Sequence, residues 1–145
     1  MSSPALPETL QEAFEFFADP ANCDRFMVEL RWPDGVACPT CGRTDVTYLA
    51  NQRRWKCKGK HPRVQFSAKV GTIFEDSHIP LHKWMIAFYR MCASKTNVSA
   101  LQLQRELELG SYRTAWFMCH RIRFAMTETN TQKLGSGGGT IEADE

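Results

Sequence analysis

Long hydrophobic runs are absent from this sequence of 145 residues. A membrane-spanning helix needs about 20 consecutive apolar residues, so we expect no membrane segment. A basic start is also lacking, because residues 1–17 contain no Lys or Arg, and acidic residues begin at Glu8. This pattern argues against a secretory signal, and we therefore expect a cytoplasmic protein.

The sequence has little net charge, only +2, but its charges are unevenly distributed. Residues 1–37 carry seven acidic and two basic groups, whereas residues 38–69 carry eight basic groups and one acidic group, a balance of +7. Residues 70–109 and 110–145 are each balanced. The +7 segment is a candidate phosphate-binding surface. A solvated basic face is the alternative, and composition alone does not decide between them.

Cysteine, in contrast, is present in six copies. Because no export signal is expected, metal ligation is favoured over disulfide bonds. Cys38 and Cys41 form a CxxC knuckle followed by Gly42, and Cys57 and His61 follow after a spacing typical of zinc sites. The sequence therefore predicts a closed, tetrahedral Zn²⁺ site of three thiolates and one imidazole, with a structural role.

The second ligand pair has an alternative interpretation, because CxxxH is less usual than CxxC. Cys57 would then be a buried thiol beside a surface His61. Against this, the segment has too few apolar residues to fold around its own core, and bound metal would stabilise it. Cys23, Cys92 and Cys119 lie alone on apolar helix faces, so we expect them in the core.

The hydrophobic pattern predicts an α+β protein, in which helices flank a small zinc β-ribbon and an all-α helix-turn-helix follows. Thr9 and Glu12 form a capping-box pattern before an apolar stripe of Leu10, Ala13, Phe14 and Phe17, and residues 21–32 predict a second helix. After Pro80, a third stripe comprises Leu81, Trp84, Met85, Phe88 and Cys92. The expected divisions are an N-terminal helical segment, the zinc ribbon, the helix-turn-helix region, a Gly-rich linker and a short final segment, at residues 1–35, 36–69, 70–128, 129–139 and 140–145.

Two helices joined by a short turn are predicted after Ser99, which pairs with Gln102 as a second capping box. The turn at residues 108–111 contains Gly110, which we expect in the left-handed conformation. In the helix that follows, the predicted buried stripe is Tyr112, Ala115, Trp116, Cys119, Ile122 and Met126. Such a pair of helices occurs in DNA-binding motifs and also in plain bundles.

The expected DNA contacts come from the basic segment and from the second of these helices. In the ribbon they are Arg53, Arg54, Lys56, Lys58, Lys60 and Arg63. In the helix they lie opposite the predicted stripe, at Arg113, Thr114 and Arg121.

Four stretches of the chain resemble the N-terminal region of zinc-ribbon insertion-sequence transposases. They are RWPDGVACPTCG, RRWKCKGK, QFSAKVGTIFEDSHIPLHKWMIAFY and SALQLQRELELGSYRTAWFMCHRIR, in unbroken order between about Pro7 and Met126. The resemblance implies a front end that binds double-stranded DNA at terminal inverted repeats, followed by an RNase H-like, DDE-type catalytic domain. A homo-oligomer is left open.

In this family the catalytic domain uses acidic residues that hold two divalent ions, such as Mg²⁺. The stretch GTIEADE resembles the start of the first catalytic strand, which makes Asp144 the first carboxylate of an incomplete triad. A two-metal site needs several carboxylates. We therefore expect a catalytically inactive, truncated chain, with Mg²⁺ relevant only to a full-length relative.

Two other functions are compatible with the sequence. One is a stand-alone, zinc-dependent DNA-binding regulator of the element, and the other is a zinc-ribbon module that binds proteins. The excess of positive charge in residues 38–69 disfavours the protein-binding module.

Overall fold

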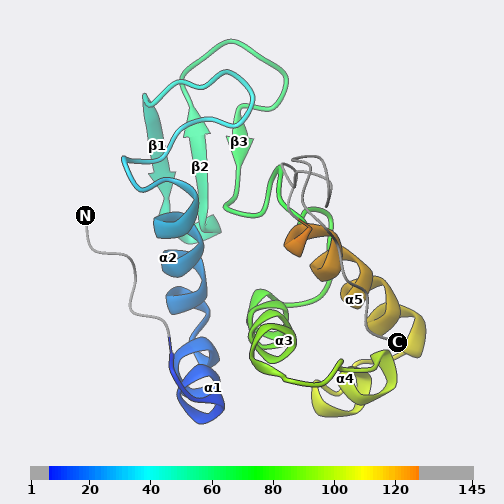
Figure 1. Ribbon diagram of the computed structural model, residues 1–145. Coiled ribbons are helices and arrows are strands. Elements are labelled where there is room, and N and C mark those ends of the chain that lie inside the picture. The colour runs from blue at the N-terminus through cyan, green and yellow to red at the C-terminus, as the bar shows by residue number, and fades with distance from the viewer. Residues whose placement is uncertain (1–6, 128–145) are drawn as a thin grey trace, which may run out of the picture.

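The computed structural model describes residues 7–127, in which helices flank a three-stranded sheet. Figure 1 shows the sheet at one end of the molecule, α1 and α2 along one side, α4 and α5 along the other, and α3 between them. The predicted α+β class is confirmed. In chain order the elements are α1 (Leu10–Ala18), α2 (Pro20–Arg31), β1 (Val46–Leu49), η1 (Ala50–Gln52), β2 (Arg54–Cys57), β3 (Gln65–Phe66), α3 (Leu81–Ala93), α4 (Ala100–Glu106) and α5 (Tyr112–Met126).

Short polar side chains begin four of the five helices. The predicted capping box at Thr9 is present, since its hydroxyl accepts from the Glu12 N–H and the Glu12 side chain accepts from the Thr9 N–H. Asp19 caps α2, which has Pro20 in its first turn. The hydroxyls of Ser99 and Ser111 cap α4 and α5. Each cap satisfies a backbone donor that the helix itself leaves unpaired.

The strands form an antiparallel meander in the order β1-β2-β3. Trp55 on β2 pairs with Phe66 on β3, and both rings contact Trp32 at the end of α2, with ring centroids 6.0 Å apart in each pair. Arg31 adds a hydrogen bond of 3.0 Å from its guanidinium to the Ala68 carbonyl. The ribbon is therefore joined to α2 by an aromatic cluster and a charged hydrogen bond.

The main hydrophobic core lies among the helices and is centred on Trp84 of α3. This side chain is 2% exposed, contacts Phe74 at 5.3 Å between ring centroids, and donates from Nε1 to the Ser77 hydroxyl at 2.9 Å. The predicted stripe is confirmed at Leu81 and Met85. The prediction for Cys92 is wrong, because its side chain lies on an exposed part of α3.

In α1 the predicted stripe is correct only in part. Ala13 and Phe17 are buried, whereas Leu10 and Phe14 are exposed. The structure packs α1 against α2 and α3 along a narrower face than the sequence pattern implies. The prediction that Cys23 and Cys119 lie in the core is confirmed, since both thiols are buried.

The buried face of α5 differs from the predicted stripe. Ala115, Cys119 and Ile122 are buried as expected, but Met118 is buried too, at 1% exposure, while Trp116 is 43% exposed. Tyr112 and Met126 are likewise exposed. Among the helices and strands, α4 makes the most extensive contact with α5, so the position of α4 contributes to the choice of the buried face. The sequence period of α5 is compatible with more than one buried face. The face that contains Tyr112 and Trp116 is not the buried one.

Polar contacts link the α4–α5 pair to the rest of the molecule. Arg90 of α3 donates two hydrogen bonds to the Glu106 carboxylate of α4, from Nε at 3.1 Å and from a terminal nitrogen at 3.2 Å. The Lys83 ammonium also approaches the Glu108 carbonyl at 3.4 Å. The two hydrogen bonds of Arg90 therefore link α3 to α4.

The turn between α4 and α5 uses a different residue from the one predicted. Glu108 adopts the left-handed conformation, with φ of 49°, whereas Gly110 has no positive φ. The chain reverses directly after α4, so the left-handed residue falls two positions before the glycine. The Leu109 N–H then donates to the Gln104 carbonyl at 3.0 Å.

In the loop between β3 and α3, one glycine is required by its surroundings. Gly71 has φ of 75°, and a Cβ there would lie 3.1 Å from a terminal nitrogen of Arg31. We expect Gly71→Ala to lower the free energy of unfolding by about 1–2 kcal/mol, from the left-handed backbone alone. Chemical denaturation of Gly110→Ala provides the control, because nothing lies within 4 Å of a Cβ at that position. Equal losses in both variants would contradict this assignment.

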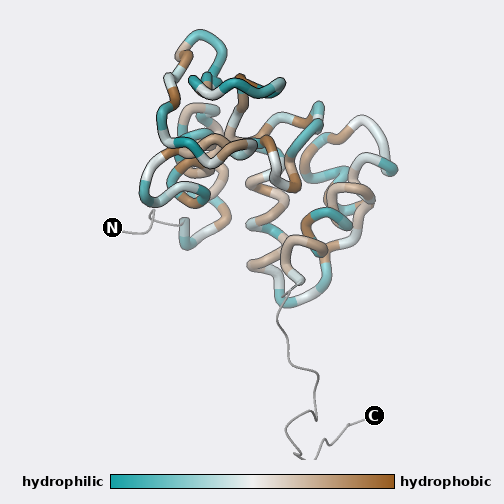
Figure 2. The backbone as a smooth tube through the Cα atoms, turned by 90° about the horizontal axis from the view of Figure 1, so that it is seen from above, coloured by the Kyte–Doolittle hydropathy of each residue, from teal (hydrophilic) through white to brown (hydrophobic). Residues whose placement is uncertain are grey.

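No helix in residues 7–127 has the length and apolarity needed to cross a bilayer. In Figure 2, hydrophilic and hydrophobic stretches alternate along the backbone, and no helix is uniformly hydrophobic.

Candidate metal centre and nucleic-acid surface

The four predicted metal ligands lie together at one end of the ribbon. The ligand atoms of Cys38, Cys41, Cys57 and His61 all lie within 4.8 Å of one another. Two of these residues come from the loop before β1, one ends β2, and one lies in the loop between β2 and β3. The antiparallel pairing of Val46 with Cys57 brings the first knuckle to the end of β2. Strand pairing therefore assembles the site from distant parts of the segment.

Two of the distances between ligand atoms match the edges of a tetrahedral zinc site. Cys41 Sγ lies 3.6 Å from Cys57 Sγ, and Cys38 Sγ lies 3.5 Å from His61 Nε2. Zn–S bonds of about 2.3 Å and Zn–N bonds of about 2.0 Å give tetrahedral edges of roughly 3.5–3.8 Å. A disulfide needs sulfur atoms about 2.0 Å apart, so these thiols are not bonded to one another.

The backbone around the site closes tightly on the ligands. The Gly59 N–H donates to Cys57 Sγ at 3.2 Å, and a Cβ on Gly59 would lie 3.3 Å from both Cys57 Sγ and the His61 ring. Gly42 follows the first knuckle with φ of 73°. Its N–H donates to the Cys38 carbonyl at 2.8 Å. The turns around both ligand pairs therefore lie close to the ligand side chains.

The thiol of Cys38 is disposed to lose its proton. Burial raises its pKa, but hydrogen bonds from the backbone N–H groups of Cys41 and Thr40 and from the neighbouring thiols outweigh burial, and the pKa falls to about 6. The thiolate is the form that binds metal. Within residues 7–127, the one buried side-chain polar atom without a hydrogen-bond partner is His61 Nδ1. The three-cysteine, one-histidine group is therefore compatible with a structural zinc ion.

The six predicted ribbon contacts divide into paired and unpaired cations. Arg53 lies 3.6 Å from Asp24, Lys58 lies 2.8 Å from Asp45, and Arg63 lies 3.2 Å from Glu75. In the part of the chain that the structure describes, the other three cations form no salt bridge; they are Arg54, Lys56 and Lys60.

These cations are spread along the ribbon. Arg53 and Arg54 lie at the hairpin turn, at the end of β2 opposite Cys57. Arg54 and Lys56 are two residues apart on one strand, so their side chains share a face of the sheet, and both are exposed. Lys60 lies at the metal end, between Cys57 and His61. The unpaired charge therefore runs from the hairpin turn to the metal site.

The predicted contacts on α5 have three different environments. Arg113 is exposed, with its guanidinium carbon 5.7 Å from the centroid of the Phe117 ring. Thr114 is half-buried, and its hydroxyl is 2.9 Å from that of the cap residue Ser111. Arg121 donates from one terminal nitrogen to the backbone carbonyls of Ile73 and Glu75, at 3.0 and 3.2 Å. The structure therefore brings Arg121 to the loop before α3 and leaves Arg113 free in solvent.

The contacts of Arg121 imply an effect on stability. We expect Arg121→Ala to lower the free energy of unfolding by about 1 kcal/mol, because two carbonyl oxygens lose a charged donor. Arg113→Ala, a matched change on the same helix, should shift it by less than about 0.5 kcal/mol. Thermal unfolding followed by circular dichroism compares the two variants. If Arg113→Ala were the more destabilising change, the bracing role of Arg121 would be wrong.

Three residues at the ribbon–helix boundary were not among the predicted contacts: Arg31, Lys69 and His82. Lys69 belongs to the basic segment, and its charge was the signal that could have identified it. Arg31 and His82 carry no comparable pattern in the sequence. The predicted catalytic residue Asp144, the linker and the short final segment lie outside the described residues.

Two thiols lie before the β1–β2 hairpin, and a third thiol and an imidazole lie after its turn. This arrangement on a small antiparallel sheet is that of a zinc ribbon. Residues 19–59 match the family described as the transposase zinc-ribbon domain. The match includes the three cysteines of the candidate metal group and ends two residues before His61. This segment is therefore similar to a transposase zinc-ribbon domain.

A curated relative extends the likeness beyond the ribbon. The chain is 30% identical over 132 residues to an uncharacterized protein in transposable element ISH50 of Halobacterium salinarum. The alignment covers 89% of this chain and 42% of that relative, so the chain spans less than half of the relative's length. No solved structure matches the chain. Together the domain and the relative support a transposase-related role.

Proposed function

We propose that this chain is a DNA-binding part of an insertion-sequence transposase, built on a ribbon that one structural Zn²⁺ holds together. The observation that carries the proposal is the row of unpaired cations Arg54, Lys56 and Lys60 on a domain of the transposase zinc-ribbon family. When surface cations neutralise phosphates, counterions condensed on the DNA are released, which favours binding. The preferred target is the double-stranded DNA at the ends of the element.

The zinc ion has a structural role in this proposal. Cys38, Cys41, Cys57 and His61 would fill its four positions, which leaves none for a reacting water. The ion supplies folding free energy to a segment whose own core consists of Cys38, Cys57 and Phe66. The folded ribbon then holds the exposed cations of β2 in fixed positions on its surface.

The pair α4 and α5 is proposed as a second DNA contact, in the manner of a helix-turn-helix. Four residues, 107 to 110, separate the end of α4 from the α5 cap at Ser111, and the two helices pack closely. Within α5 there are three arginines and no acidic residue. Arg113 lies in the first turn of α5, from which a recognition helix contacts base edges.

We further propose that residues 1–145 bind DNA without cleaving it. Strand transfer by two metal ions needs several converging carboxylates. Within residues 7–127, the cluster of potential ligands is the three-cysteine, one-histidine group, whose thiolates suit zinc and not Mg²⁺. Incubating zinc-loaded protein and labelled element ends with Mg²⁺ or Mn²⁺ tests this proposal, and any cleavage products would contradict it.

Retention of duplex DNA over a range of salt concentrations tests the binding proposal. If several phosphates are contacted, the logarithm of the binding constant should fall linearly with the logarithm of salt, by about 0.9 for each contact. A protein-binding ribbon would show no such dependence and no retention at low ionic strength. Comparing element ends with unrelated duplexes of equal length then measures sequence preference.

A further inference from the structure

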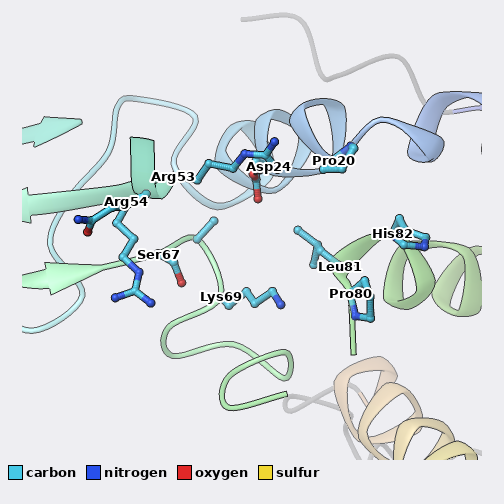
Figure 3. A pocket seen from close by; sticks show the side chains of 11 residues that line it. Pro20, Asp24, Arg53, Arg54, Ser67, Lys69, Pro80, Leu81 and His82 are labelled. Atoms are coloured by element: carbon cyan, nitrogen blue, oxygen red, sulfur yellow. Dashed lines mark ion pairs between the residues drawn. The ribbon is translucent and has the colours of Figure 1, made fainter. Parts of the chain in front are cut away.

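A cleft of about 400 Å³ lies where the ribbon meets the helices. Its walls come from the start of α2, the hairpin turn before β2, the loop after β3 and the start of α3. Figure 3 shows Arg53 of the hairpin beside Asp24 of α2, and Lys69 extending from the loop toward the start of α3. Segments far apart in the sequence therefore place charged side chains around one space.

The charges around this cleft are mainly positive. Asp24 provides the acidic group, and its carboxylate is 3.6 Å from the Arg53 guanidinium. Arg54 and Lys69 also line the cleft, and neither forms a salt bridge within residues 7–127. Three cations and one carboxylate give the lining a formal charge of +2, from Arg53, Arg54, Lys69 and Asp24. An anion is the ligand that this lining favours.

The start of α3 adds to this preference. Pro80 begins the helix without any side-chain cap, and the first turn contains no acidic residue. Pro80, Leu81 and His82 line the cleft, so the positive end of the helix dipole borders the same space as Lys69. The helix terminus reinforces the side-chain cations and is not the basis of the site.

A second cleft of about 280 Å³ shares three lining residues with the first, namely Arg54, Ser67 and Lys69. Arg63 also lines the second cleft, together with the acidic residues Glu75 and Asp76. The Glu75 carboxylate is already engaged by Arg63 and by the Gly71 N–H. Two adjoining clefts that share two cations suit a ligand with repeated negative charges better than a single small anion.

We propose that the cleft lined by Arg54, Lys69 and the start of α3 binds the phosphodiester backbone of DNA and joins the ribbon to the helical part on one strand. The inference rests on the proposed function and adds to it a specific phosphate site and the contact residue Lys69. Phosphate contacts of this kind set the position of a protein on the duplex without reading its sequence. Asp24 pairs with Arg53 at the edge of the cleft, and its negative charge weakens the binding of phosphate.

Two pairs of variants test the cleft through opposite effects. Lys69→Ala removes a cation from it, whereas Lys95→Ala removes an exposed cation after the far end of α3. Asp24→Asn removes the acid from the cleft, whereas Glu29→Gln removes an exposed acid from the same helix. Each matched pair changes the net charge equally, so long-range electrostatic effects are similar within a pair. Zinc content and circular dichroism confirm that each variant is folded.

Fluorescence anisotropy with labelled duplex DNA at several chloride concentrations measures the result. For Lys69→Ala we expect severalfold weaker binding and a salt slope smaller by about 0.9, the loss of one phosphate contact. For Asp24→Asn we expect severalfold tighter binding. Lys95→Ala and Glu29→Gln should show clearly smaller changes in the same directions.

The outcomes separate this inference from the proposed function. If wild-type protein does not bind duplex DNA at low salt, the proposed function fails. If it binds, but Lys69→Ala matches Lys95→Ala and Asp24→Asn matches Glu29→Gln, the cleft is not the phosphate site and only this inference fails. Inorganic phosphate should compete no better than chloride at equal ionic strength. Stronger competition would assign the cleft to free phosphate and overturn the DNA-backbone proposal.

Discussion

Replacing Cys57 with Ser is expected to remove the metal and to unfold the ribbon. The Cys57 thiol is 2% exposed and lies 3.6 Å from Cys41 Sγ, so a hydroxyl at this position leaves three ligands around the ion. Zinc binding contributes roughly 10 kcal/mol or more to the folding of small zinc domains. The ribbon's own core has three buried residues and does not replace that contribution.

Native mass spectrometry and backbone NMR measure this result. We expect zinc stoichiometry to fall from one to near zero and amide signals of residues 36–69 to collapse toward unfolded positions. Trp32 and Arg31 contact the ribbon, so the end of α2 should change as well, while α3 to α5 keep their signals. Cys92→Ser is the matched control, because its exposed thiol lies outside the ligand group. Retention of one zinc by Cys57→Ser would show that the ligand set is wrong.

Removing the unpaired cations Arg54 and Lys60 together is expected to weaken DNA binding strongly. Two lost phosphate contacts should reduce the salt slope by about 1.8, which corresponds to an affinity loss on the order of 50-fold at 0.1 M salt. The physical reason is that no carboxylate in residues 7–127 pairs with either side chain, so both are free to bind phosphate.

The double variant Lys58→Ala with Arg63→Ala is the control for this experiment. It removes the same formal charge from the ribbon, but both side chains already contact carboxylates, those of Asp45 and Glu75. Hydrogen bonding to Asp45 also raises the pKa of Lys58. Binding phosphate with these residues requires breaking an existing pair, so we expect a clearly smaller loss. Equal losses in the two double variants would mean that salt bridges do not select the contact residues.

Much of the metal site could be predicted from the sequence. The spacing of Cys38, Cys41, Cys57 and His61 identified the group that the structure brings together. A closed metal site needs certain side chains at certain spacings along a short segment, and both properties are visible in one dimension. The same holds for helix starts, where Thr9 and Ser99 act on backbone groups only three residues away.

The errors concern which side of a helix is covered. In α5 the periodicity was correct, but Trp116 proved exposed and Met118 buried. In α3 the predicted stripe reached Cys92, whose side chain is exposed. A period describes how residues repeat around an axis, and only a neighbouring element defines the direction that becomes the interior.

The availability of the cations was likewise hidden from the sequence. Arg53 and Arg54 are adjacent in the chain, yet Arg53 contacts Asp24 and Arg54 contacts no carboxylate in the described part of the protein. The partner of Arg53 is 29 positions away, on α2. Arg121 is a similar case, because the carbonyls it binds belong to the loop before α3.

By itself the sequence determined which cysteines and histidine lie together as a candidate metal group, the helix caps at Thr9 and Ser99, the α+β class and the location of the positive charge. Each of these depends on residue type and short spacing. The tertiary structure alone decided which cations are free, which face of α5 is solvent-exposed and where Lys69 meets the start of α3. Those properties depend on contacts between segments that are distant in the chain, and their pairing is set by how the ribbon and helices pack together.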